Sequence, residues 1–259
     1  MSPAGFTRDE WQVLSGELCL REATQRDKKR SLPASELLKN DICRELLDHL
    51  ISVTGSPDRA VMASLLSKRL AFLMTGACLY AMSVYNKGLI LSVENTLIEY
   101  GHDNGLWTSC IPLYQTKPLF VTEEERNAWR QNITSNLFGG LLAPLWRTFS
   151  IVSGIASQIL WENTAVRVYS LYERRMANVI CPSLRARIRR DFDWLLNDAD
   201  ASLFGLDENP LRRFRRPAFM LPDGRGQVRF RRTCCFYYKA SKPVEYCSTC
   251  PLVRPRRKP

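Results

Sequence analysis

The chain has 259 residues, which is long enough to bury one large core or a core with a small appendage. Its 45% hydrophobic and 24% charged residues are typical of an ordinary folded protein and exclude a largely disordered chain. Residues 183–259 carry 18 basic and 8 acidic residues, a net of +10, whereas residues 1–182 carry 19 and 18. The net charge of +11 is therefore a property of the C-terminal third, where nucleic acid or an acidic membrane surface would ordinarily be considered as a partner.

The start of the chain, Met1–Glu10, lacks a basic segment followed by an apolar one, so we expect no secretory signal. The best candidate for a membrane span is Leu70–Asn86, an uncharged stretch at the lower limit of length that contains polar residues. We interpret it as a buried core helix. A soluble cytoplasmic protein with free thiols is expected, and its basic C-terminal third is compatible with weak association with the inner-membrane surface.

Helical patterns dominate the first two-thirds of the chain. Thr7 and Glu10 have the spacing of a capping box, and apolar residues follow at helical spacing. Thr122 and Glu125 repeat this spacing before a pattern that stays helical to about Asn178, with interruptions near Gly139–Gly140 and at Gly154. The other predicted helices run from Ser35 to near Gly55, from Asp58 through the apolar stretch, and from Ser183 to Asn197.

Two short regions have the character of β-structure. Around residues 88–114, β-rich runs flank Asn104–Gly105, which is a strong hairpin signal. Residues 219–230 read as a second hairpin, with a turn at residues 222–226, that leads towards Cys234. The predicted fold is therefore mainly α with a small β component (α+β): a helical substrate-binding body, residues 1–205, and a small basic cysteine-rich segment, residues 206–259, that ends in a solvated tail.

Four of the nine cysteines lie within 17 residues near the C-terminus, in the pattern C-C-x11-C-x2-C: Cys234, Cys235, Cys247 and Cys250. Thiolate clusters of this kind bind zinc or iron–sulfur groups. Neighbouring side chains in an extended segment point to opposite sides, so the adjacent pair is poorly suited to one tetrahedral ion. A 2Fe–2S cluster, whose two irons each need two thiolates, suits the pattern better, while zinc with an unusual ligand pair remains open. The other cysteines lie singly among apolar residues and are interpreted as small core side chains: Cys19, Cys43, Cys78, Cys110 and Cys181.

This segment, with Arg231–Arg232 before it, resembles the C-terminal signature of the FhuF-like ferric siderophore reductases. Leu160–Thr164, Leu-Trp-Glu-Asn-Thr, and Asp207–Leu211, Asp-Glu-Asn-Pro-Leu, are similar to further pieces of that family, so the resemblance covers roughly the second half of the chain. It implies that the four cysteines ligate a 2Fe–2S cluster and that no other catalytic residue is needed. It also implies one-electron reduction of an imported Fe(III)–siderophore, favouring the hydroxamate type, because Fe²⁺ is held far more weakly than Fe³⁺ by hard oxygen ligands.

Five further residues are candidates for the site. Arg231, Arg232 and Lys239 lie beside the anionic thiolates, where cations favour a reduced cluster and attract acidic donors or anionic iron complexes. Trp161 and Asn163 are candidates for the substrate cleft, although a Trp in an apolar helix is more often a core residue and Asn163 would equally serve to cap or bridge helices.

No G-x-G-x-x-G or flavin fingerprint is present in the sequence. We therefore expect an external electron donor, a reduced ferredoxin or a flavoprotein reductase, and no nucleic-acid partner. Two alternatives remain open: a zinc-bound nucleic-acid or protein-interaction module, suggested by the basic aromatic C-terminus, and a siderophore-binding protein without redox turnover.

Overall fold

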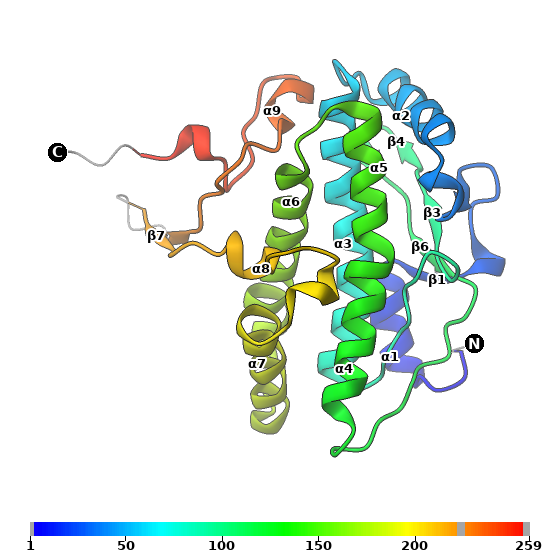
Figure 1. Cartoon of the computed structure of the whole chain (residues 1–259), viewed down its shortest axis with the longest axis vertical. Helices are drawn as coiled ribbons and strands as arrows, with labels where there is room; N and C mark the ends of the chain where they lie inside the picture. The colour runs from blue at the N-terminus through cyan, green and yellow to red at the C-terminus, as the bar shows by residue number, and fades with distance from the viewer. Residues whose placement is uncertain (1–2, 222–225, 256–259) are drawn as a thin grey trace.

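The computed structural model describes residues 3–221 and 226–255. It confirms a mainly α fold with a small β component (Figure 1). Its α-helices are α1 (Arg8–Gln12), α2 (Asn40–Thr54), α3 (Arg59–Tyr85), α4 (Arg126–Ser135), α5 (Ala143–Ser153), α6 (Ser157–Ser170), α7 (Pro182–Asn197), α8 (Pro210–Arg213) and α9 (Tyr237–Ala240). Its strands are β1 (Leu20–Glu22), β2 (Ser31–Pro33), β3 (Leu97–Glu99), β4 (His102–Asp103), β5 (Leu106–Trp107), β6 (Ile111–Leu113), β7 (Phe219–Met220) and β8 (Gln227–Val228).

Helix α3 is the axis of the fold. Its N-cap residue Asp58 accepts the backbone N–H of Val61 at 2.8 Å, and its C-cap Asn86 adopts the left-handed conformation. The helix is apolar on nearly every side because α2, α5, α6 and α7 pack around it. It is long and apolar enough to cross a membrane by length and composition, but 78% of its most apolar window is buried inside the fold. The predicted core helix is confirmed.

Helices α4 and α5 follow one another as a single rod in front of α3 (Figure 1). Between them the chain forms a π-helical segment, Asn136–Leu142, so the predicted break at Gly139–Gly140 is wrong: the helix widens and continues. Glycine is needed at position 139 because a Cβ atom there would lie 3.0 Å from the carbonyl oxygen of Leu203. Gly154 does end α5, in the left-handed conformation, as predicted.

The first capping box is confirmed and the second is wrong. At α1 the hydroxyl of Thr7 accepts the N–H of Glu10 at 3.2 Å, and the carboxylate of Glu10 accepts the N–H of Thr7 at 2.8 Å. At α4 the hydroxyl of Thr122 instead donates to the carboxylate of Glu125 at 3.2 Å, and the helix begins only at Arg126. Helix α2 also begins later than predicted, after a 3₁₀ turn at residues 36–38.

The strands form four two-stranded sheets. Both predicted hairpins are confirmed: β4 pairs with β5 across Asn104 and Gly105, which both have positive φ, and β7 pairs with β8. The turn of the second hairpin, at residues 222–225, lies outside the described residues. Strand β1 pairs in parallel with β6, and β2 pairs in antiparallel with β3. The apolar run Leu89–Val93 forms no strand; Leu89 and Leu91 are buried in the core instead.

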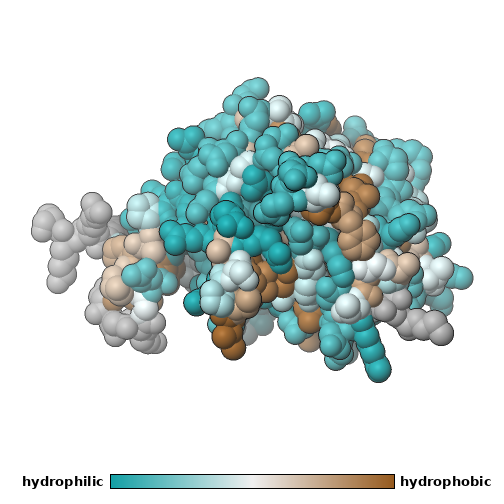
Figure 2. Space-filling view, turned by 90° about the horizontal axis from the view of Figure 1, so that it is seen from below, coloured by the Kyte–Doolittle hydropathy of each residue, from teal (hydrophilic) through white to brown (hydrophobic). Residues whose placement is uncertain are grey.

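The C-terminal segment leaves α8, runs along the outer side of α6 and reaches α3 through α9 (Figure 1). Figure 2 shows the molecule from below: hydrophilic residues cover most of this face and apolar residues gather in small separate areas. The predicted tail is described only as far as residue 255, and residues 256–259 lie outside the described residues.

Candidate metal centre

A buried carboxylate on α6 fixes the C-terminal segment to the helical body. Glu162 is 1% exposed and accepts the backbone N–H groups of Arg232 at 2.6 Å and Thr233 at 2.7 Å. It also accepts the hydroxyl of Thr233 at 2.5 Å. The Nε of Arg231, a residue that is itself 3% exposed, lies 3.8 Å from the same carboxylate. A buried carboxylate is costly unless donors surround it, and here the segment supplies those donors.

The neighbouring residue on α6 makes the second attachment. The side-chain amide of Asn163 donates to the carbonyl of Ser64 at 3.1 Å and to the hydroxyl of Ser67 at 2.8 Å, both on α3. The hydroxyl of Ser64 in turn donates to the carbonyl oxygen of Cys235 at 2.8 Å. These hydrogen bonds therefore link α6 to α3, and α3 to the backbone of Cys235.

The four C-terminal cysteines meet as two pairs. The sulfurs of Cys235 and Cys247 are 3.5 Å apart, and Cys250 is the cysteine of the C-x2-C turn whose side chain interacts with that of Cys234. Each pair thus takes one member from the adjacent cysteines and one from the C-x2-C turn. This differs from the simplest interpretation of a C-x2-C turn, in which both of its sulfurs hold one metal.

The two-pair arrangement fits a binuclear cluster. In residues 3–221 and 226–255, no group of three or more His, Cys, Asp or Glu side chains is gathered as a preformed site for one metal ion. Two sulfurs for each of two irons is the donor set that a 2Fe–2S cluster requires.

Hydrogen-bond donors and a cation surround these sulfurs. The backbone N–H of Phe236 donates to the sulfur of Cys234 at 3.4 Å, and the ammonium of Lys68, on α3, lies 3.6 Å from the sulfur of Cys235. The hydrogen bond with Cys247 lowers the pKa of Cys235 to about 4, and the charges of Lys68 and Arg231 act in the same direction. The same hydrogen bond and burial raise the pKa of Cys247. Cys235 is therefore the readiest thiolate of the four.

The sequence-predicted candidates separate into three groups. Arg231 and Asn163 line a cavity of about 170 Å³ that Cys247 also lines, and each has a buried polar atom without a hydrogen-bond partner in the described part of the chain. The side chains of Arg232 and Lys239 are exposed, and Lys239 stacks on the ring of Phe236. Trp161 is 4% exposed and lines a different cavity, with Pro210 and Phe214, away from the cysteine pairs.

Three residues that the sequence analysis did not select belong to the site: Lys68, Glu162 and Arg167. Lys68 and its neighbour Arg69 interrupt a largely apolar helix, which is a usable signal, because a charge in a buried helix needs a partner. Arg167 follows Asn163 by four residues and so lies on the same face of α6. The motif Asp207–Leu211, in contrast, is structural: Asn209 caps α8 and ties it to the end of α7.

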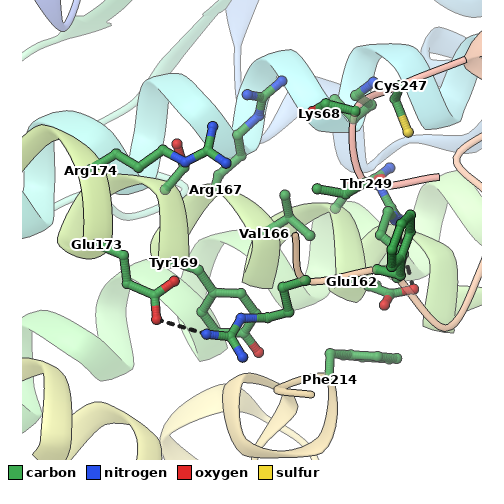
Figure 3. A pocket seen from close by; sticks show the side chains of 16 residues that line it. Lys68, Glu162, Val166, Arg167, Tyr169, Glu173, Arg174, Phe214, Cys247 and Thr249 are labelled. Atoms are coloured by element: carbon green, nitrogen blue, oxygen red, sulfur yellow. Dashed lines mark hydrogen bonds and ion pairs between the residues drawn. The ribbon is translucent and has the colours of Figure 1, made fainter. Parts of the chain in front are cut away.

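Figure 3 shows the cavity beside Cys247, with Lys68, Arg167 and Arg174 along one side and Glu173 towards another. Two further hollows, of about 640 and 470 Å³, share lining residues with it on α3 and α6. Arg167 lines all three. We call these three neighbouring hollows together the basic groove. Its cationic lining residues are Lys68, Arg69, Arg167, Arg174, Arg175, Arg229, Arg231 and Lys242.

The cysteines outside the C-terminal segment do not all behave as core residues. Cys43, Cys78 and Cys110 are buried, as predicted. Cys181 is exposed at the start of α7, and Cys19 is only partly buried, so the prediction is wrong for these two. Cys19 adopts a positive φ immediately before β1, and its thiol interacts with that of Cys110, which immediately precedes β6.

Comparison with known proteins agrees with this site. No curated protein matches the chain. The family model described as "FhuF 2Fe-2S C-terminal domain" matches residues 231–252, which contain all four cysteines of the two pairs. The model described as "Ferric iron reductase FhuF-like transporter" matches residues 64–221, more than half of the chain. The chain therefore belongs to the FhuF-like ferric iron reductase family and carries its 2Fe–2S C-terminal domain.

Proposed function

We propose that this protein reduces the iron of a ferric siderophore by one electron and so releases Fe(II). In this proposal Cys234, Cys235, Cys247 and Cys250 hold the 2Fe–2S cluster, which when bound supplies electrons one at a time. The observation that carries the proposal is the pairing of the four sulfurs beside the basic groove. Ferric iron is the substrate, and its release follows because hard oxygen ligands hold Fe²⁺ weakly.

The residues around the sulfurs have three tasks in this reaction. Lys68 and the backbone N–H of Phe236 stabilise negative charge on sulfur, which favours the reduced form. Glu162 and Asn163 hold the segment against α6 and α3, so the sulfurs keep a fixed position relative to the groove. The burial of Cys235 and Cys250, each 1% exposed, keeps water away from one side of the site.

We propose that the two parts of the chain have different roles in this reaction. Residues 1–205 form the helical body that binds the substrate, and residues 206–259 form the basic segment that carries the cluster. The electron comes from an external protein, a reduced ferredoxin or a flavoprotein reductase, because the sequence has no nucleotide-binding fingerprint. The exposed charges of Arg232 and Lys239 would attract an acidic donor.

Anaerobic purification and elemental analysis provide the first test. We expect a coloured protein with about two irons and two acid-labile sulfides per chain, as a 2Fe–2S group requires. After reduction with dithionite, an EPR signal should appear that is lost when ferric siderophore is added, with stoichiometric Fe(II) captured by a ferrous chelator. A colourless protein with stoichiometric zinc would refute the proposal. A siderophore that binds without oxidising the reduced protein would indicate a non-redox binding protein.

Matched variants assign the ligands. Cys247→Ser should abolish the colour and the reduction of iron, whereas Cys181→Ser, at an exposed cysteine remote from the pairs, should leave both unchanged. NADPH alone should not support reduction, and addition of a ferredoxin with its reductase should. Direct reduction by NADPH and the purified chain would contradict the proposed external donor.

A further inference from the structure

The basic groove holds more positive charge than its own carboxylates balance. Five of its cations form no ion pair with a carboxylate in the described part of the chain: Lys68, Arg69, Arg167, Arg174 and Lys242. The carboxylates that line the groove are already occupied by neighbouring groups. These are Glu17 with Arg175, Glu162 with the backbone of the C-terminal segment, Glu173 with Arg215 and Arg229, and Glu245 with the hydroxyl of Tyr237.

Arg167 is the centre of this imbalance. It is half-buried, and its guanidinium lies 5.9 Å from the centre of the Phe72 ring. Burial lowers its pKa, and the positive charges of Arg231 and Arg69 lower it further. Like charges held together in a partly dry hollow raise the free energy of the fold unless an anion joins them.

The cysteine pairs account for only part of this charge. Lys68 and Arg231 lie nearest to the sulfurs and serve as their immediate counter-charges. Arg174 lies two helical turns beyond Arg167 and lines the hollow that extends away from the cysteines. Arg69 lines the hollow of about 640 Å³ and donates a hydrogen bond to the carbonyl of Ser109. These arginines extend the positive charge along the groove, beyond the reach of a cluster at one end.

Apart from the exposed Lys242, the cations beyond the cluster are arginines, and this indicates the chemistry of the missing anion. A guanidinium presents parallel N–H donors that match the two oxygens of a carboxylate. Phe72 and Trp107 supply apolar surface in the same hollows. A neutral tris(hydroxamate) complex, in which three monoanionic ligands cancel the charge of Fe³⁺, would leave the arginines unsatisfied. A hydroxycarboxylate chelate keeps free negative charge on its carboxylates.

We propose that the basic groove binds an anionic ferric chelate of the hydroxycarboxylate type, with its carboxylates on Arg167 and Arg174 and its iron towards Cys247. This inference rests on the proposed function and narrows its substrate from siderophores in general to this charged class. It differs from the hydroxamate preference that the sequence resemblance implies.

Gallium chelates test the binding separately from the redox step, because Ga³⁺ resembles Fe³⁺ in charge and ligand preference but is not reduced. Equilibrium dialysis of the holoprotein against gallium citrate and against the neutral gallium complex of desferrichrome gives both affinities. Gallium citrate should bind at least roughly tenfold more tightly, as expected when one or more charge-assisted hydrogen bonds are gained. Its binding, and not that of the neutral complex, should weaken as salt is raised.

Three variants locate the site. Arg167→Gln and Arg174→Gln should each weaken gallium citrate binding roughly tenfold or more, since each removes a charged donor pair. Arg167→Lys, which keeps the charge but loses the paired donors, should lose less. The matched control is Arg190→Gln, an exposed arginine on α7, which should bind as the unmodified protein does. The EPR signal of each reduced variant reports that its cluster and fold are intact.

Equal affinity for the two gallium complexes, or an Arg167→Gln variant that binds gallium citrate normally, would overturn the inference. That failure is distinguishable from failure of the proposed function. Reduction of a neutral ferric hydroxamate with no preference for charge would leave the reductase proposal standing and remove this one. Selective, arginine-dependent gallium citrate binding with no iron reduction would uphold the site and remove the redox step.

Discussion

Replacing Glu162 with Gln tests whether this carboxylate holds the C-terminal segment on the body. The substitution preserves size but removes the charge that accepts two backbone N–H groups and the hydroxyl of Thr233. The new amide also brings an NH₂ group against these donors. Arg231, which is 3% exposed and has no other carboxylate within ion-pair distance in the described chain, then loses its carboxylate partner.

The size of the destabilisation follows from the hydrogen bonds and the ion pair that Glu162 loses. Each hydrogen bond to a charged acceptor contributes about 1.5–3 kcal/mol, and breaking a buried ion pair from one side costs about 3–5 kcal/mol. These terms overlap, so we expect the segment to open about 3–5 kcal/mol more easily. That corresponds to a loss of amide protection of roughly 150-fold to several-thousandfold, confined to residues near 231–233.

Hydrogen exchange read by mass spectrometry measures this opening directly, and the rate at which a chelator bleaches the visible spectrum measures its effect on the cluster. The matched control is Glu208→Gln, because Glu208 pairs with Arg213 on the surface and its side chain is 59% exposed. This control should change protection by less than about 1 kcal/mol. Unchanged protection at 231–233 in a folded Glu162→Gln protein would show that the segment is held by something other than this carboxylate.

Replacing Asp191 with Asn should lower the free energy of unfolding by about 3–5 kcal/mol, because Asp191 is fully buried and accepts hydrogen bonds from both Nη groups of Arg126. Urea denaturation measures this change, and a loss below about 1 kcal/mol would contradict the prediction. The hydrogen bond with Cys110 lowers the pKa of Cys19 to about 6, so the rate of alkylation of Cys19 should be near maximal at pH 7 and fall about tenfold per pH unit below 6. A rate profile whose midpoint lies near pH 9 would refute the lowered pKa. Lys68→Gln should lower the reduction potential of the cluster by roughly tens of millivolts, because a cation 3.6 Å from sulfur favours the reduced form. Protein-film voltammetry measures this potential, and an unchanged or raised value would contradict the prediction.

The parts of the fold that the sequence predicted are those whose cause is local. The capping box at Thr7, the hairpin at Asn104–Gly105 and the left-handed cap at Gly154 each depend on a few adjacent residues. The central helix was predicted because its apolar composition leaves no polar face. At Thr122 the same local rule failed, because the spacing of a capping box does not decide which of two hydrogen bonds the hydroxyl makes.

The features that were missed depend on partners far away in the chain. Strands β1 and β6 are three residues each and pair across about ninety residues, so neither carries a periodic signal of its own. The cysteine pattern identified the type of cofactor, but Lys68 and Arg167 reach it from helices that the sequence gives no reason to bring together. Trp161 illustrates the reverse error: it belongs to the quoted motif, yet the helix turns its side chain towards another cavity.

Each cysteine pair joins one of the adjacent cysteines to one cysteine of the C-x2-C turn, so the C-terminal segment is held to itself at two points. Cys234 and Cys235 are neighbours in the chain but serve different pairs, so the eleven residues before Cys247 form a loop fastened at both ends. The carbonyl of Cys235 also bonds to Ser64 of the central helix, which joins this loop to the core of the body. Assembly of the metal site and docking of the segment should therefore occur as one cooperative event, with iron supply as well as sequence deciding when this protein becomes fully folded.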